Sequence, residues 1–220
     1  KNKFISLDET ANDYRTDFIK NKTHKNTYII IYGKYSTHFG KKLKFEGEKI
    51  VKNETSISLF DRKNMDLNFD DKKKLLKKKL KDTIIDLSKD NKIILLYPTP
   101  VSTEHVFYRV LGSTSKLINP DVKLYLKNPD YYLFDKINYS TQSYREFFSE
   151  EISLFNSINS KNIYKIELEK TFCPENQCLF YDNKNIYIYD THHPSYEGSK
   201  KINKLIMETI NQSLAVTEWS

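Results

Sequence analysis

A carboxylate and an imidazole stand three residues apart in the segment YDTHHPSYEG (189–198). At this spacing Asp190 can orient His193 and fix its tautomer, while the other ring nitrogen takes a proton from a nucleophile. These roles suit a serine hydrolase or an acyltransferase. A structural interpretation stays open, because Asp-x-x-His pairs are common and either residue could cap a helix. His192, His193 and Asp190 could also bind a metal, but no second ligand cluster with recognisable spacing accompanies them, so we expect no metal.

The residues on either side of this pair predict a loop between a strand and a helix. The run NIYIY (185–189) is β-branched and aromatic, which is typical of a strand. After it, Ser195 can act as the N-cap of a helix whose apolar residues recur at helical spacing: Ile202, Leu205, Ile206 and Ile210. Such loops collect ligands and catalytic groups in open α/β sheets. Gly198 is more typical of close packing of this helix than of substrate contact.

Length and hydropathy limit the class of protein. The 220 residues show no Pro/Gly-rich linker or composition break, which predicts one domain over residues 1–220. Mean hydropathy is −0.67, and no apolar run approaches the ~18 residues of a membrane span. The amino terminus does not resemble a signal peptide. We therefore expect the chain itself to be soluble, with any membrane anchor outside these residues.

The chain is basic, with a net charge of +7 and a pI near 9.1. Much of the excess lies in KKKLLKKKLK (72–81), where Leu76 and Leu80 begin an apolar stripe that continues through Ile84 and Leu87. This pattern predicts an amphipathic helix with a solvated lysine face. Anionic lipid or an acidic polysaccharide would suit the charge. A nucleic-acid partner is not expected, because no phosphate loop, zinc pattern or RNA-binding motif is present.

The two cysteines, Cys173 and Cys178, enclose four residues including a proline. This spacing predicts a small loop closed by a disulfide, and a bridge would indicate an oxidising compartment such as a periplasm. A pair of reduced thiols is the alternative. Structural zinc is not expected with only two cysteines, and the spacing is too wide for a thioredoxin-type motif.

Apolar runs alternate with helical patterns along the rest of the chain. We expect strands at 28–32, 92–97 and 163–168, and helices at about 69–89 and 144–158. Strands separated by helices predict a parallel sheet with helices on both faces, and residues 92–97 lack polar alternation, which fits a strand covered on both sides. Residues 101–143 are harder to place and could form an insertion or lid beside the substrate.

The carboxyl-terminal third resembles the SGNH domain of membrane-bound acyltransferases, of acyltransferase family three, that O-acetylate bacterial cell-surface polysaccharides. The resemblance depends on a helix with Tyr144 and Arg145, the cysteine loop, the Asp-x-x-His motif and a final helix led by a glycine. With a strand that runs into YPTP (97–100), it covers roughly residues 28–210. It implies a three-layer α/β/α sandwich with a mainly parallel, flavodoxin-like sheet, and catalytic roles for Asp190 and His193.

The nucleophile of such an enzyme has no clear place in this chain. SGNH enzymes carry it in a Gly-Asp-Ser block after the first strand, and no such tripeptide occurs. In one register IIIYGKYSTH (29–38) fills that role, with Ser36 as nucleophile and Gly33 as an oxyanion neighbour, although Lys34-Tyr35 replaces the expected Asp. In the other register these residues match a later strand of the family, and spacing to the Asp-His loop favours it. The nucleophile block would then lie upstream of Lys1 or have been lost, and Ser36 would be a turn or capping serine.

The resemblance also implies a function. We expect an extracytoplasmic, periplasmic serine O-acetyltransferase or esterase domain that acts on acyl esters of a polysaccharide or lipopolysaccharide and needs no cofactor. We expect it to be tethered to a membrane acyltransferase domain outside this chain. The alternative is a glycan-binding or partner-docking domain that keeps the SGNH scaffold without its nucleophile.

Overall fold

The computed structural model describes residues 27–33, 39, 67–102, 105–107, 110, 139–182 and 184–217, and the backbone of 41–46 and 49–54. A parallel sheet lies at its centre, with strand order β1-β4-β6. These strands are β1 (Tyr28–Ile31), β4 (Lys92–Leu96) and β6 (Ile163–Ile166). In this register Ile94 of the middle strand pairs with Ile30 on one side and Tyr164 on the other. The predicted parallel arrangement is therefore present.

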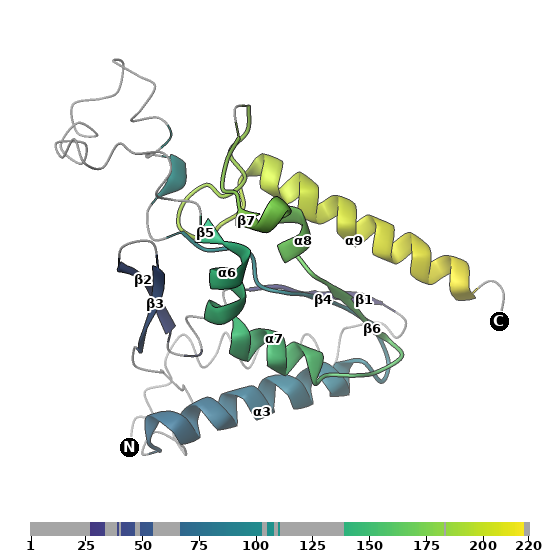
Figure 1. Ribbon diagram of the computed structural model, residues 1–220. Coiled ribbons are helices and arrows are strands. Elements are labelled where there is room, and N and C mark those ends of the chain that lie inside the picture. Colours follow the sequence, from purple (N-terminus) through teal and green to yellow (C-terminus); the bar gives the residue numbers. More distant parts are fainter. Residues whose placement is uncertain are drawn as a thin grey trace, which may run out of the picture.

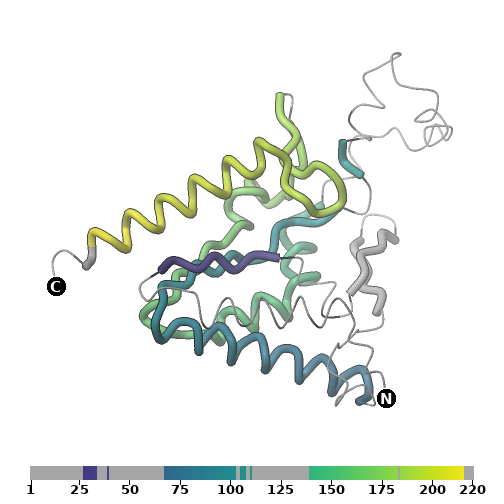
Figure 2. The backbone as a smooth tube through the Cα atoms, turned by 180° about the vertical axis from the view of Figure 1, so that it is seen from behind, coloured from purple at the N-terminus to yellow at the C-terminus, as the bar shows by residue number. Residues whose placement is uncertain are grey.

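The middle strand contributes side chains to two separate cores, because successive residues of a strand point to opposite faces. Ile93 and Leu95 pack with residues of α3 (Phe69–Leu87) and α7 (Ser149–Asn156). Ile94 and Leu96 pack with residues of α9 (Tyr196–Thr217). In Figure 1, α3 and α7 lie below the sheet and α9 crosses on its other side; Figure 2 shows the same layers from behind. The predicted three-layer α/β/α fold is confirmed.

The lysine-rich run forms α3, as its periodicity predicts. Asn68 caps this helix by accepting the N–H of Asp71 at 2.9 Å. Two of its lysines, Lys73 and Lys77, reach Glu150 of α7 at 2.8 and 2.5 Å. The lysine face is thus only partly a solvent face, because some of its charge ties the two helices together. None of the helices that the structure describes is long and apolar enough to cross a bilayer.

Two expectations about local structure are wrong. The helix expected at 144–158 is two helices, α6 (Thr141–Phe147) and α7, separated at Phe148, whose φ and ψ of −93° and 11° are not helical. The run 185–189 forms no regular strand: Ile186 and Ile188 make only isolated bridges, to Tyr181 and Pro194. Its β-branched residues are instead folded into the loop that carries Asp190. The backbone also shows an antiparallel hairpin that was not expected, formed by β2 (Lys41–Glu46) and β3 (Lys49–Glu54).

The predicted disulfide joins Cys173 to Cys178. It closes the loop between α8 (Glu169–Phe172) and β7 (Gln177–Cys178), which includes a short 3-10 turn, η4 (Pro174–Asn176). Strand β7 pairs with β5 (Tyr139–Ser140), just before α6. Both cysteines are buried in a third apolar cluster that also contains aromatic and aliphatic side chains, namely Tyr139, Tyr144, Phe147, Phe148, Phe180 and Ile188. The bridge therefore fixes the segment between α8 and β7, which lies on the path of the chain from β6 to the Asp190–His193 loop.

Candidate active site

The carboxylate of Asp190 organises the loop that follows residue 189. Its Oδ1 accepts the backbone N–H groups of His192 and His193, both at 2.8 Å. The loop is closed by the N–H of Tyr189, which donates to the carbonyl of His193 at 2.8 Å. A short polar side chain that accepts hydrogen bonds from the backbone two and three residues later is a local turn device of Asp and Asn. The Asp-x-x-His spacing that predicts a catalytic pair therefore also forms the turn.

The same carboxylate contacts the ring of His193. Oδ2 of Asp190 lies 2.6 Å from Nδ1 of His193. The side chain of His193 is 65% exposed, whereas that of Asp190 is 22% exposed. With Nδ1–H directed at the carboxylate, Nε2 is the ring nitrogen that can accept a proton. An oriented imidazole with an accessible acceptor nitrogen is the arrangement that general-base catalysis requires.

Opposing effects act on the pKa of Asp190. Partial burial raises it, but hydrogen bonds from the N–H of His192 and from the ring and N–H of His193 outweigh the burial. The pKa of Asp190 is therefore held well below its usual range. The carboxyl is ionised throughout the physiological range and can stabilise a protonated imidazole.

The Asp-His loop is supported by the segment that follows β4. Backbone N–H groups of Ser102 and Phe107 donate to the carbonyls of Thr191 and Tyr189 at 2.7 and 2.8 Å. The ring of Tyr189 packs against those of His105 and Phe107, with centroids 5.2 and 4.9 Å away. Residues 101, 102 and 105–107 belong to the stretch that was hard to place from the sequence, and Ser102 and Phe107 hold the loop in position. No sequence signal pointed to these contacts, because they are mostly backbone hydrogen bonds.

The start of α9 forms the other support. Ser195 is the N-cap, and its hydroxyl accepts the N–H of Gly198 at 3.1 Å and donates to the carbonyl of Ile186. A Cβ on Gly198 would lie 2.0 Å from the carbonyl oxygen of Tyr187. Glycine is therefore required for close packing of the helix on the preceding strand-like segment, as the sequence indicated.

Asp190, His192 and His193 also bring three ligand atoms within 4.8 Å of one another, a grouping that could hold a metal ion. The rings of the two histidines lie 3.8 Å apart, and Nδ1 of His192 is 2.8 Å from the hydroxyl of Thr191. Both carboxylate oxygens of Asp190 already accept hydrogen bonds from the loop. Nε2 of His193 stays open to a proton or a metal ion, and the hydrogen bonds of the loop already orient the ring without a metal.

Two candidate site residues, Gly33 and Ser36, follow the first strand, and the structure describes only Gly33. Gly33 lies just beyond β1, at the carboxyl edge of the parallel sheet. At this edge the hydroxyl of Tyr32 hydrogen-bonds with that of Thr99 at 3.2 Å, which joins the end of β1 to the segment after β4. Ser36 lies outside the described residues.

Comparison with protein families supplies the classification. The family described as "SGNH domain (fused to AT3 domains)" matches residues 5–208. Comparisons with curated proteins and with solved structures find no match. Because the family match spans nearly the whole sequence, the chain belongs to the SGNH domains that are fused to AT3 domains.

This membership defines the protein as an SGNH-type domain related to hydrolases and acyltransferases. It also agrees with the three-layer fold. The family's fusion to AT3 domains connects such a domain with a membrane acyltransferase and implies membrane association.

Proposed function

We propose that this is an extracytoplasmic domain that transfers or hydrolyses an acetyl ester on a hydroxyl of cell-surface polysaccharide. His193 acts as general base and Asp190 orients it. The observation that carries the proposal is the 2.6 Å contact between Oδ2 of Asp190 and Nδ1 of His193, with the imidazole exposed. Family membership supports the same chemistry.

The proposed reaction has two halves. Nε2 of His193 takes the proton of a serine hydroxyl while its oxygen attacks the acyl carbonyl, and the imidazolium then protonates the departing alkoxide. In the second half His193 deprotonates a sugar hydroxyl or water, which attacks the acyl-enzyme and releases the serine. Asp190 keeps Nδ1 protonated throughout and stabilises the imidazolium. Within this chain Ser36 is the candidate for the serine.

The disulfide supports the extracytoplasmic part of the proposal. Structural disulfides persist in oxidising compartments and are rare in the cytosol. Cys178 is fully buried and Cys173 nearly so, which fits a structural bridge. Titration of thiols in denaturant, before and after reduction, tests this point on protein purified from its natural host. Two free thiols before reduction would contradict it.

Turnover of a chromogenic acetyl ester tests the catalytic proposal. We expect His193→Ala to lower the rate by on the order of 10²–10⁴ and Asp190→Asn to lower it substantially, because each removes part of general-base catalysis. Met207→Ala, an exposed residue of α9, is the control and is expected to match the unmutated protein. Ser36→Ala asks whether this serine is the nucleophile.

The outcomes separate the proposal from its rival. If the unmutated protein turns over the ester no faster than a blank without protein, the proposed enzymatic activity is contradicted. The absence of a Gly-Asp-Ser tripeptide favours the rival, a glycan-binding or partner-docking domain on the same scaffold. If His193→Ala abolishes turnover and Ser36→Ala does not, the catalytic role of His193 stands and Ser36 is not the nucleophile.

A further inference from the structure

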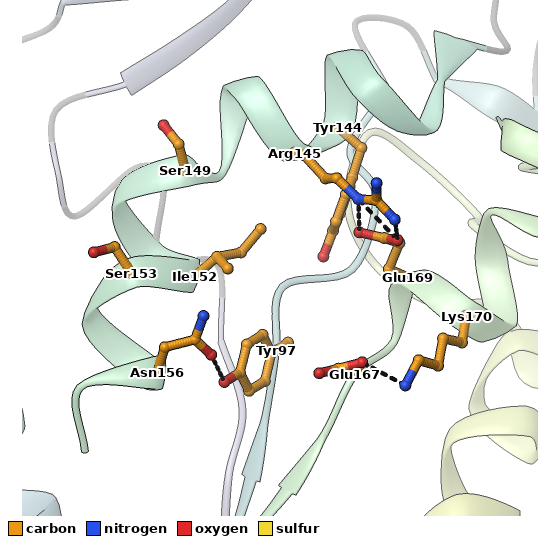
Figure 3. Close-up of a pocket in the computed structure, with 10 residues that line it drawn as sticks. All are labelled: Tyr97, Tyr144, Arg145, Ser149, Ile152, Ser153, Asn156, Glu167, Glu169 and Lys170. Atoms are coloured by element: carbon orange, nitrogen blue, oxygen red, sulfur yellow. Dashed lines mark hydrogen bonds and ion pairs between the residues drawn. The ribbon is translucent and has the colours of Figure 1, made fainter. Parts of the chain in front are cut away.

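A second site lies at the carboxyl edge of the sheet, between the ends of β4 and β6. Tyr97 directly follows β4, Glu167 directly follows β6, and the N–H of Tyr97 donates to the carbonyl of Ile166 at 2.9 Å. Here a pocket of about 540 Å³ opens between α6, α7 and α8, and Figure 3 shows its lining side chains. Open α/β sheets bind ligands outside the carboxyl ends of their strands. The pocket shares no lining residue with the Asp190–His193 loop.

The charged groups at the pocket are paired with one another. Arg145 of α6 binds Glu169 through Nε and Nη2, at 3.0 Å to Oε2 and 2.6 Å to Oε1. Lys170 binds Glu167 at 2.7 Å. The lining therefore contains two cations and two carboxylates and has no net charge. Each pair still offers both donor and acceptor atoms to a ligand that can share them.

The opposite wall comes from α7 and the end of β4. The hydroxyl of Tyr97 donates to Oδ1 of Asn156 at 2.5 Å, which fixes the amide beside the ring. Ile152 adds an apolar surface, and Ser149 and Ser153 are exposed hydroxyls on the same helix. Figure 3 shows these side chains on one side of the pocket and the two ion pairs on the other. The break at Phe148 lets α6 contribute Arg145 to the side of the ion pairs, while α7 forms the opposite side.

We propose that this pocket binds an uncharged sugar unit. A sugar ring presents apolar C–H faces and a circle of hydroxyls that each donate and accept hydrogen bonds. The partly buried Ile152 offers an apolar surface to one face, and the paired carboxylates, guanidinium, ammonium and the amide of Asn156, which the buried Tyr97 holds, suit the hydroxyls. The volume lies within the range of small-ligand pockets.

Charged ligands fit the pocket less well. An anion that binds Arg145 or Lys170 would also face the carboxylate paired with it, Glu169 or Glu167. A cation would have to compete with the same Arg and Lys for the carboxylates. A neutral polyol can hydrogen-bond to both members of such an exposed pair and meets no like charge there.

Binding of neutral disaccharides tests the proposal without any acyl donor, so the result is independent of catalysis by His193. The probes are maltose, lactose, cellobiose and N,N′-diacetylchitobiose, measured by saturation-transfer NMR and calorimetry. N-acetylneuraminic acid and glucosamine serve as anionic and cationic sugars. Ser153→Trp fills the pocket from an exposed position, and Met207→Trp places the same side chain at an exposed position on α9, on the other face of the sheet.

We expect at least one neutral disaccharide to bind in the millimolar range, Ser153→Trp to abolish binding and Met207→Trp to retain it. Glu167→Gln, which keeps the shape of the side chain, is expected to weaken binding by about tenfold because it removes a charge-assisted acceptor. This variant decides the matter if Ser153→Trp does not fold. No binding of any neutral probe, binding unchanged in both pocket variants, or tighter binding of a charged sugar would overturn the proposal.

Discussion

Asp190 accepts hydrogen bonds from two backbone groups and one imidazole, so one charge determines both the path of the loop and the orientation of His193. In a general-base site the two functions are linked, because a loop that relaxes also loses the ring geometry. Removal of the charge should therefore alter stability as well as rate. The stability effect should depend on pH, since it exists only while Asp190 is ionised.

Asp190→Asn tests this dependence. The folded-state pKa of Asp190 lies below the unfolded value of about 3.9, so its contribution is present above that value and is lost as pH falls toward the folded pKa. At pH 7 we expect the variant to be less stable by about 1.5–3 kcal/mol, the usual value of hydrogen bonds to a charged group. Urea unfolding at pH 7 and at pH 3 should show a smaller difference at the lower pH.

The control for this comparison is Asp86→Asn, at an exposed carboxylate of α3 that pairs with Lys89. Its effect should remain within about 0.5 kcal/mol. A destabilisation by Asp190→Asn that is the same at both pH values would show that the charge of the carboxylate is not what holds the loop.

Gly198 gives a second prediction for a single residue. Gly198→Ala places a Cβ 2.0 Å from the carbonyl oxygen of Tyr187, and this neighbour is backbone and cannot rotate away. We expect a loss of about 1–3 kcal/mol, typical of overpacking, even though alanine is the better helix former. Thermal unfolding followed by circular dichroism measures the loss. Asn203→Ala, at an exposed position of the same helix, should be neutral or slightly stabilising; equal effects of the two would contradict the proposed clash.

Elements with a strong period were predictable from the sequence. Leu76, Leu80 and Ile84 mark α3, and the uninterrupted apolar run at 93–96 marks β4, because burial of those side chains dominates the local energy. Phe148 shows what was not predictable. It continues the apolar stripe of residues 144–158, but its side chain is buried in the cluster around the disulfide, and the helix is broken where the chain turns to place it there.

The functional sites also differ in whether local sequence or tertiary structure brings their residues together. Asp190 and His193 are close in sequence, so their contact depends on a local turn that spacing alone suggests. The pocket at the carboxyl edge of the sheet joins Tyr97, just after β4, with Arg145 of α6 and Glu169 of α8. Their proximity depends on the register of the parallel sheet, and no local pattern contains it. The sequence predicts Tyr97 at the end of a buried strand and Arg145 in a helix that resembles the family, but it does not predict that the two lie at one site.

The disulfide provides a test at the level of elements. Replacement of Cys173 and Cys178 by alanine opens the loop between α8 and β7. The entropy of so short a loop predicts a loss of about 2 kcal/mol. Denaturant unfolding of both proteins, with and without reductant, measures it: reductant should lower the stability of the unmutated protein to that of the variant and leave the variant unchanged. A variant as stable as the oxidised protein would contradict a structural role for the bridge.

At the scale of the whole molecule, β4 is the middle strand of the sheet that separates the two cores, and the outer strands β1 and β6 also contribute residues to both. Ile93 contributes to the core with α3 and α7, and Ile94, the next residue, contributes to the core with α9. Both side chains are fully buried. If residues 1–220 are one domain, loss of either core should destabilise the other, because each depends on the position of the same strand.

Ile93→Ala and Ile94→Ala test this coupling. Each should cost about 2–5 kcal/mol and lower the midpoint of a single transition for the whole chain, since neither core can remain folded once β4 is released. Thermal unfolding should be followed by far-ultraviolet circular dichroism and by fluorescence of the tyrosines, which are spread over both faces of the sheet. Met207→Ala, exposed on α9, is the neutral control. Two resolved transitions, with each variant lowering only one of them, would show that the layers fold separately and that the single-domain prediction is wrong.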